Sequence, residues 1–213
     1  MIEKIKDNIF TIIGIILILI SISIFVYDKY MDNQKVLENV ELVEDFFEIE
    51  DSSIKEEIVE EEVIKEEEDK KTSSSPTYNY IAVLEIPSIK LKRGLVDYKS
   101  KYNNVKYNIQ IIEHSEMPDV EKSNLILAGH NGTSNVSFFN DLDKLKEDSL
   151  VYVYYNNIKY IYKINNNYEV KKDGSVEIIR NRNKNTITLI TCKKDSNDKQ
   201  LVYIGYLVDK VEY

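Results

Sequence analysis

Two hydrophobic patterns divide the chain. Near the N-terminus the apolar positions are continuous, and residues 9–26 read IFTIIGIILILISISIFV with no charged residue. From residue 79 to residue 213, apolar and polar residues alternate with a period of two, in runs rich in Val, Ile and Tyr. A continuous apolar run predicts a helix in lipid, and a period of two predicts half-buried β-strands.

The continuous run is long enough to cross a membrane, because its 18 residues would extend about 27 Å as a helix. A cleaved secretory signal is the competing interpretation, but its apolar region is usually about 7–15 residues long and ends in small residues. Here the run ends in Phe25 and Val26, and Tyr27 and Asp28 follow. We therefore predict an uncleaved transmembrane anchor at residues 9–27.

The charges that flank the anchor predict its orientation. Lys4 and Lys6 precede it and Lys29 follows it, which is a weak positive-inside bias. We expect residues 1–8 in the cytoplasm and the chain beyond the anchor outside it. The predicted location is the cell membrane, with a single span.

The acidity of the chain is confined to its first third. The formal charge is −9, but residues 1–71 carry 20 acidic residues against 8 basic ones, whereas residues 72–213 carry 17 against 20. We interpret residues 28–78 as a self-repelling acidic stalk and linker that ends near TSSSP. Residues 54–68, which lack Gly and Pro, favour helix within it.

The alternating runs define a domain at residues 79–213. Asn156 and Asn157 lie between two of them, which predicts a hairpin. A short helix is expected at 136–146, where Phe139, Leu142 and Leu145 follow a helical spacing. Many short strands with one or two helices indicate an all-β barrel or sandwich. The predicted strands are 80–86, 107–112, 124–130, 149–155, 159–164, 185–192 and 200–208.

The composition excludes several kinds of site. A single Cys allows no internal disulfide, and two His with one Cys do not make a Cys/His zinc cluster. We expect no metal and no cofactor. The domain has three Arg and no basic tract, which argues against a nucleic-acid partner.

Cys192 and His130 are the candidate catalytic residues. Each ends an apolar run, NTITLITC and NLILAGH, where a side chain opens onto a surface. Lys193 and Lys194 follow the thiol, and positive charge favours the nucleophilic thiolate. The two residues could face each other across a cleft as nucleophile and acid/base.

Four segments in order resemble the sortases, the membrane-anchored cysteine transpeptidases of Gram-positive bacteria. They are YIAVLEIPSIKLKRGLV, LILAGHNG, FFNDLDKLKEDSLVYVYYNNIKYIYKI and TLITC. The resemblance covers residues 79–211. It implies a closed sortase β-barrel of about eight strands.

The resemblance also implies roles and partners. Cys192 would attack an LPxTG-like sorting signal on a surface protein and form an acyl-thioester, while His130 protonates the leaving amine and deprotonates the incoming one. The acceptor would be an amine of a peptidoglycan precursor or of a pilin. We place substrate specificity in the variable loop at 165–185.

The sequence departs from the family at the position of its oxyanion-stabilising Arg. The aligned segment is QLVYIGYLV, so Gln200 stands there. An amide donates neutral hydrogen bonds and serves in oxyanion holes, but it supplies no charge. Lys199 would point to the opposite face of the strand. We favour an active enzyme that uses Gln200 and backbone N–H groups.

Other interpretations remain open. A degenerate, membrane-tethered sortase-like domain would bind peptides or act as a scaffold without catalysis. A papain-like or L,D-transpeptidase-type enzyme also needs a Cys/His pair, but the order of His and Cys and the absence of a Gly-rich segment beside Cys192 disfavour it. His114 fits a loop, Asn131 fits a turn or a residue that orients His130, and Thr191 fits an inward-facing position.

Overall fold

A computed structural model describes residues 9–56 and 78–213 of the chain. The chain divides into two compact units, Met1–Glu41 and Leu42–Tyr213, and each is considered by itself.

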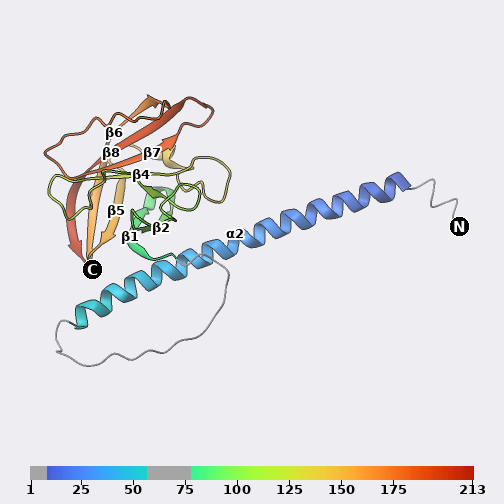
Figure 1. Cartoon of the computed structure of the whole chain (residues 1–213), viewed down its shortest axis with the longest axis horizontal. Helices are drawn as coiled ribbons and strands as arrows, with labels where there is room; N and C mark the ends of the chain where they lie inside the picture. The colour runs from blue at the N-terminus through green and yellow to red at the C-terminus, as the bar shows by residue number, and fades with distance from the viewer. Residues whose placement is uncertain (1–8, 57–77) are drawn as a thin grey trace. The chain divides into compact units, whose positions relative to one another are not determined.

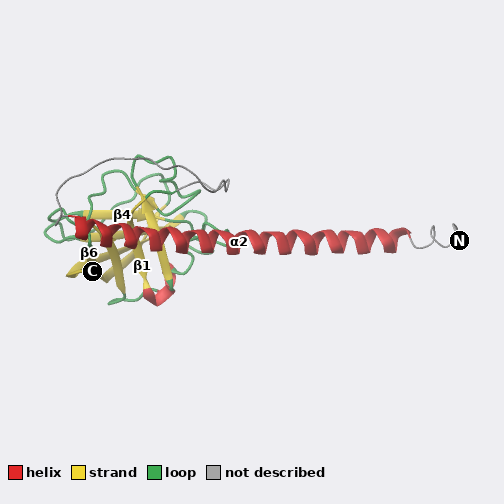
Figure 2. Ribbon diagram, turned by 90° about the horizontal axis from the view of Figure 1, so that it is seen from below, coloured by secondary structure: helices red, strands yellow, loops and turns green. Residues whose placement is uncertain are grey.

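The N-terminal helix α2 (Ile9–Glu56) is continuous, as Figure 2 shows. Its segment Thr11–Met31 has a mean hydropathy of 2.4 and none of it is buried. By length and composition this is the one helix in the described part of the chain that could cross a membrane. The helix continues into the segment interpreted as an acidic stalk, as far as Glu56. Of the helix expected at 54–68, the part after Glu56 lies outside the described residues.

The second unit contains an eight-stranded sheet in the order β2-β1-β5-β6-β8-β7-β4-β3. All neighbours pair antiparallel except β4 and β7, which are parallel. Figure 1 shows how the long strands β6 and β8 run beside each other. The strands are β1 (Tyr80–Ile86), β2 (Leu91–Val96), β3 (Gln110–Ile111), β4 (Asn124–Ala128), β5 (Leu150–Tyr155), β6 (Ile158–Lys171), β7 (Thr186–Cys192) and β8 (Lys199–Glu212).

The sheet curls into a nearly closed barrel whose seam lies between β2 and β3. Side chains join the two edges: the Arg93 Nε–H donates to Asn108 Oδ1 at 2.8 Å, and Asn108 Nδ2 donates to the Gly94 carbonyl at 2.8 Å. Both side chains are buried, so these bonds replace the missing ladder. The expected eight-stranded barrel is confirmed.

Apolar side chains cover both faces of the sheet around β4 and β7. Leu125, Leu127 and Leu189 point into the main core, whereas Ile126 and Ile190, one residue out of step, belong to a second cluster on the other face. Because both strands are buried on both faces, their register is strongly specified. The residues at their ends are therefore held by a rigid part of the barrel.

Part of α2 packs within this second unit. Val43 and Phe46 are buried in a cluster with Tyr80, Val83 and Val96 of β1 and β2. The segment expected as a spacer thus also contributes side chains to a hydrophobic cluster.

The hairpin expected at Asn156-Asn157 is confirmed. Both residues have positive φ, +51° and +57°, which matches the two-residue turn that suits the twist of paired strands. It joins β5 to β6.

The short helix expected at 136–146 is confirmed only in part. The segment forms turns and one short 3₁₀ helix, η2 (Leu142–Lys144). A second 3₁₀ helix, η1 (Pro87–Ile89), joins β1 to β2. Within 136–146, backbone N–H groups donate to the carbonyl three residues earlier: Leu142 to Phe139 and Leu145 to Leu142. Phe139, Leu142 and Leu145 are three residues apart, a spacing that fits a 3₁₀ helix with its three residues per turn. All three side chains are buried.

Several strands also differ from expectation. Residues 91–96 form β2, which the alternation did not single out, and the run at 107–112 contains only the two-residue β3. The strand expected to end at residue 164 continues to Lys171 as part of β6. The loop expected at 165–185 therefore begins only at Lys172.

Candidate active site

The parallel pair β4 and β7 brings the loop that carries His130 beside Cys192. Ala128 pairs with Ile190, and the Gly129 N–H donates to the Ile190 carbonyl at 3.1 Å, one residue beyond the end of β4. His130 follows Ala128 by two residues, just as Cys192 follows Ile190. Both therefore lie at the same end of the pair, and both are half-buried.

Gln200 lies directly opposite Cys192 on the neighbouring strand. The two residues are partners in the antiparallel ladder of β7 and β8, so their side chains project from the same face. Gln200 is half-buried. The Gln200 amide, a neutral hydrogen-bond donor, therefore lies on the same face of the sheet as the Cys192 thiol.

Lys199 projects from the other face of β8. Its ammonium bonds to Glu169 at 3.0 Å, and Lys193 pairs with the same carboxylate. These hydrogen bonds, first from Lys193 and then from Lys199, lower the pKa of Glu169. Lys199 thus has an anionic partner away from Cys192.

A cavity of about 620 Å³ opens at the end of β7. Its wall includes Cys192, the Asn131–Gly132 loop, residues 193–197 and Lys172. Lys194 of this wall is paired with Asp143 at 3.1 Å. His130 and Gln200 are not among the residues of this wall. Sequence reasoning missed Lys172, which follows the unexpected extension of β6.

Side chains hold the two strand ends together. The buried Thr191 hydroxyl donates to the Gly129 carbonyl at 2.9 Å, and Asn131 Nδ2 donates to the Cys192 carbonyl at 3.0 Å. Thr191 faces inward, as its position on the strand predicts. Asn131 contacts the Cys192 backbone, a role that its place beside Gly132 did not reveal.

The chain folds back behind His130. The Phe139 N–H donates to the His130 carbonyl at 3.0 Å, and the Phe139 ring is fully buried. Gly129 makes this possible, because a Cβ there would lie 2.8 Å from the Phe139 ring. His114, in contrast, lies in an exposed turn after β3 with φ +66°.

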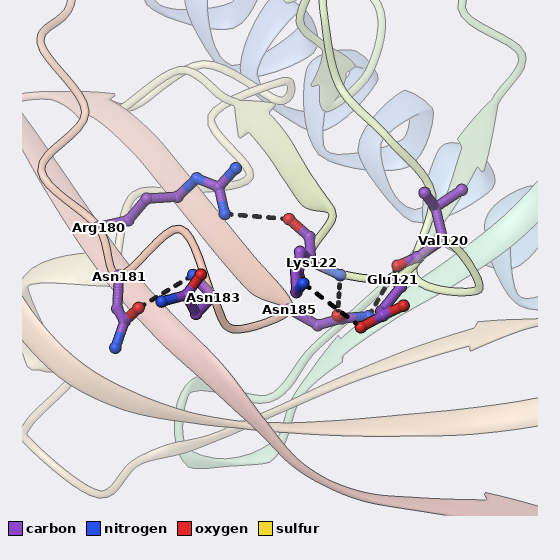
Figure 3. Close-up of polar contacts among 7 residues, drawn as sticks. All are labelled: Val120, Glu121, Lys122, Arg180, Asn181, Asn183 and Asn185. Carbon is purple, nitrogen blue, oxygen red and sulfur yellow. Dashed lines mark hydrogen bonds and ion pairs between the residues drawn. The ribbon is translucent and has the colours of Figure 1, made fainter.

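Loop 172–185, between β6 and β7, lies against the sheet face that carries the second apolar cluster. Val176 and Ile178 pack against this cluster, and the Tyr168 hydroxyl donates to the Glu177 carbonyl at 2.9 Å. The end of the loop is held by Asn185, as Figure 3 shows. Its amide accepts from the Lys122 N–H at 2.6 Å and donates to the Pro118 and Val120 carbonyls at 3.0 and 2.9 Å.

Arg180 adds a contact to the same cluster of polar residues. Its Nη1 donates to the Lys122 carbonyl at 3.1 Å (Figure 3). The loop is thus joined to the segment between β3 and β4 at two points. Residues 9–56 and 78–213 contain no group of three His, Cys, Asp or Glu that could hold a metal ion.

The barrel places a thiol and an imidazole at the same end of two adjacent strands, and these are the two groups that cysteine acyl-transfer chemistry uses. Residues 84–208 match the model of the sortase domain. Sortase A of Bacillus anthracis is 29% identical over 213 residues, covering 95% of this chain and 96% of that protein. The chain belongs to the sortase family, whose members are generally cysteine transpeptidases that anchor surface proteins or pilins.

Solved sortase structures share the fold. Sortase C1 from Streptococcus agalactiae has a TM-score of 0.53 at 29% identity, covering 61% of this chain and 68% of that one. Sortase A from Corynebacterium diphtheriae has a TM-score of 0.55 at 22% identity, covering 62% of each chain.

Proposed function

We propose that this sortase cleaves an LPxTG-like sorting signal through an acyl-thioester on Cys192 and transfers the cleaved protein to an amine. The observation that supports this most is the position of Cys192, the chain's single thiol. It lies in an open cavity beside the loop that carries His130. A nucleophile and an acid/base carried on adjacent strands are the pair of groups that acyl transfer through a covalent intermediate uses.

The chemistry has two halves. The Cys192 thiolate attacks the scissile carbonyl carbon, and the resulting tetrahedral intermediate collapses as the C–N bond breaks. The His130 imidazolium gives its proton to the leaving amine, which leaves a thioester. The acceptor amine then attacks the thioester carbonyl and passes a proton to His130, and the C–S bond breaks as this second tetrahedral intermediate collapses, which releases the new amide and regenerates the Cys192 thiolate.

Gln200 is the proposed side-chain donor to the oxyanion. It is paired with Cys192 across the ladder and projects from the same face. Preorganised donors aimed at developing charge are usually the largest single catalytic contribution, and amide side chains serve in this role.

The proposed setting is the outer face of the cell membrane. Residues 9–27 anchor the chain, residues 28–78 link the anchor to the domain, and residues 79–213 carry catalysis outside the cytoplasm. The substrates are surface proteins with a C-terminal sorting signal. The acceptor is the amine of a peptidoglycan precursor or of a pilin.

The test uses the full chain in detergent and a panel of sorting-signal peptides. Intact-mass measurement should detect one acyl adduct, which hydroxylamine removes as expected for a thioester. Cys192→Ala should form no adduct, and His130→Ala should turn over orders of magnitude more slowly while keeping the β-rich circular dichroism spectrum. An adduct that persists in Cys192→Ala refutes the assignment.

The substitution of Gln for Arg favours one alternative, a degenerate sortase that binds peptides without cleaving them. The same experiment separates the two. Saturable peptide binding by the parent protein, with no adduct from any peptide, would support a membrane-tethered binding or scaffold protein.

A further inference from the structure

The hydrogen-bond ladder between β4 and β7 changes character at the active site. In a parallel ladder the bonds are evenly spaced, and each strand donates and accepts in steps of two residues. The last backbone bond at this end runs from the Gly129 N–H to the Ile190 carbonyl. The next two would run from the Cys192 N–H to the Gly129 carbonyl and from the Asn131 N–H to the Cys192 carbonyl.

Side chains occupy both of these acceptors instead. The Gly129 carbonyl accepts from the Thr191 hydroxyl at 2.9 Å, and the Cys192 carbonyl accepts from Asn131 Nδ2 at 3.0 Å. Strand β4 correspondingly ends at Ala128, before the ladder reaches Cys192. The two side chains substitute for two backbone donors.

This substitution leaves the Cys192 N–H without a ladder partner. The Lys193 N–H donates to the Lys199 carbonyl of β8. Donors alternate sides along a strand, so the Cys192 N–H points the other way, toward β4. Within residues 78–213, the bond from that N–H to the Gly129 carbonyl is not formed. The backbone N–H of Cys192 therefore takes no part in the hydrogen bonds of the sheet.

The orientation of the Asn131 amide is determined by chemistry. A carbonyl only accepts, so the amide nitrogen must face Cys192. Its Oδ1 is then buried, and no described residue donates to it. A buried acceptor without a donor is unfavourable and calls for an explanation other than stability.

We propose that Asn131 is a positioning residue that keeps the end of the β4–β7 ladder open, so that the Cys192 N–H donates to the oxyanion. The inference rests on the proposed function, in which Cys192 is the nucleophile. The Cys192 N–H would be a second donor to the oxyanion, beside the neutral amide of Gln200, at a site whose sequence lacks the family's Arg. Without the Asn131 side chain, the backbone N–H of residue 131 would bond the Cys192 carbonyl. The two strand ends would then draw together until the Cys192 N–H bonded the Gly129 carbonyl, which would remove that donor.

The test compares two reactions of the same thiol. Acylation by a sorting peptide passes through an oxyanion, whereas alkylation by iodoacetamide occurs at a saturated carbon and does not. In the full chain, Asn131→Ala should lower kcat by about 10²–10³-fold, the loss typical of one oxyanion donor. KM should stay within about twofold, since the substrate carbonyl is not yet charged on binding. The rate of alkylation should be unchanged.

Two further variants sharpen the comparison. Asn131→Asp should lose at least as much kcat, because a carboxylate cannot donate to the Cys192 carbonyl. Asn135→Ala is the matched control: it removes an exposed Asn of the same loop and should match the parent protein.

Two results would overturn the inference about Asn131 alone: parental kcat in Asn131→Ala, or losses of alkylation and kcat in equal proportion. The second result would indicate general damage to the site. A parent protein that forms no thioester with any peptide would remove the proposed function, and this inference with it.

Discussion

At the scale of single residues, the two neighbours Gln200 and Lys199 differ in which face of β8 they occupy. Gln200 is neutral, but the ladder places it on the face of Cys192, while the nearby cation Lys199 is turned to the other face and bonded to Glu169. A flexible cation that already has a carboxylate partner is poorly placed to serve the oxyanion. A half-buried amide opposite the thiol is better placed.

We therefore expect Gln200→Ala to lower kcat/KM by about 10–10³-fold, equivalent to about 1.4–4 kcal/mol for one neutral donor. Gln200→Arg should keep or raise activity, since it would place a charged donor at the same position. Steady-state cleavage of a fluorogenic sorting peptide measures both.

Lys199→Ala is the matched control, one residue along the same strand. Its activity should stay close to that of the parent protein. If Lys199→Ala loses more activity than Gln200→Ala, the donor has been assigned to the wrong face of β8.

Gly129 tests the packing behind His130. A Cβ at residue 129 would lie 2.8 Å from the buried Phe139 ring. Gly129→Ala should therefore lower the free energy of unfolding by about 1–3 kcal/mol, the usual cost of overpacking a core. Urea denaturation measures the change.

The control for Gly129 is a double-variant comparison. In a Phe139→Leu background the smaller side chain leaves space, so the same Gly129→Ala change should cost less. Equal costs in the two backgrounds would mean that the Phe139 ring is not what excludes a side chain at residue 129.

At the scale of elements, loop 172–185 depends on polar anchors more than on its own sequence. Asn185 makes three hydrogen bonds to the segment between β3 and β4, and Arg180 adds another. The loop begins at Lys172, which lines the cavity of Cys192. The Lys172 end is held separately, since its N–H donates to the Asp198 carbonyl at 2.7 Å.

Asn185→Ala should loosen the loop. Its loss removes three hydrogen bonds, to the Lys122 N–H and to the Pro118 and Val120 carbonyls, which we expect to cost about 1–3 kcal/mol of stability. Hydrogen exchange at residues 172–185 should accelerate more than exchange in the central strands, because the polar anchors hold this loop in particular. Mass spectrometry of peptic fragments measures this.

Asn183→Ala provides the comparison, since the Asn183 contact in this cluster runs through its backbone N–H, to Asn181 Oδ1. It should leave both stability and exchange nearly unchanged. Equal acceleration in the two variants would show that loss of any Asn here, rather than of the Asn185 bonds, mobilises the loop.

At the scale of the whole molecule, the apolar segment Thr11–Met31 predicts an integral membrane protein. Protease added to intact protoplasts should remove the domain, because we expect the chain beyond the anchor to lie outside. Immunoblotting against an epitope at the C-terminus measures this. A protected domain, or a mature N-terminus near residue 30, would contradict the predicted topology.

The sequence by itself determined the properties that depend on local pattern. Alternation with a period of two is a property of each strand alone, so it predicted an all-β barrel or sandwich, and the Asn156-Asn157 turn predicted its hairpin. The closed barrel was predicted by the resemblance to the sortases. Local pattern predicted less where one spacing of apolar residues fits two kinds of helix. Phe139, Leu142 and Leu145 fit an α-helix, but their interval of three residues was used for 3₁₀ turns.

Only the tertiary structure decided which residues meet at the site. Alternation tells which face of its own strand a residue occupies, but not which strand lies beside it. The pairing of β4 with β7, and of Cys192 with Gln200, depends on registers set by burying both faces of the central strands. The Asn131 contact depends further on where the ladder stops, because a side chain can replace a backbone donor only where the strand has ended.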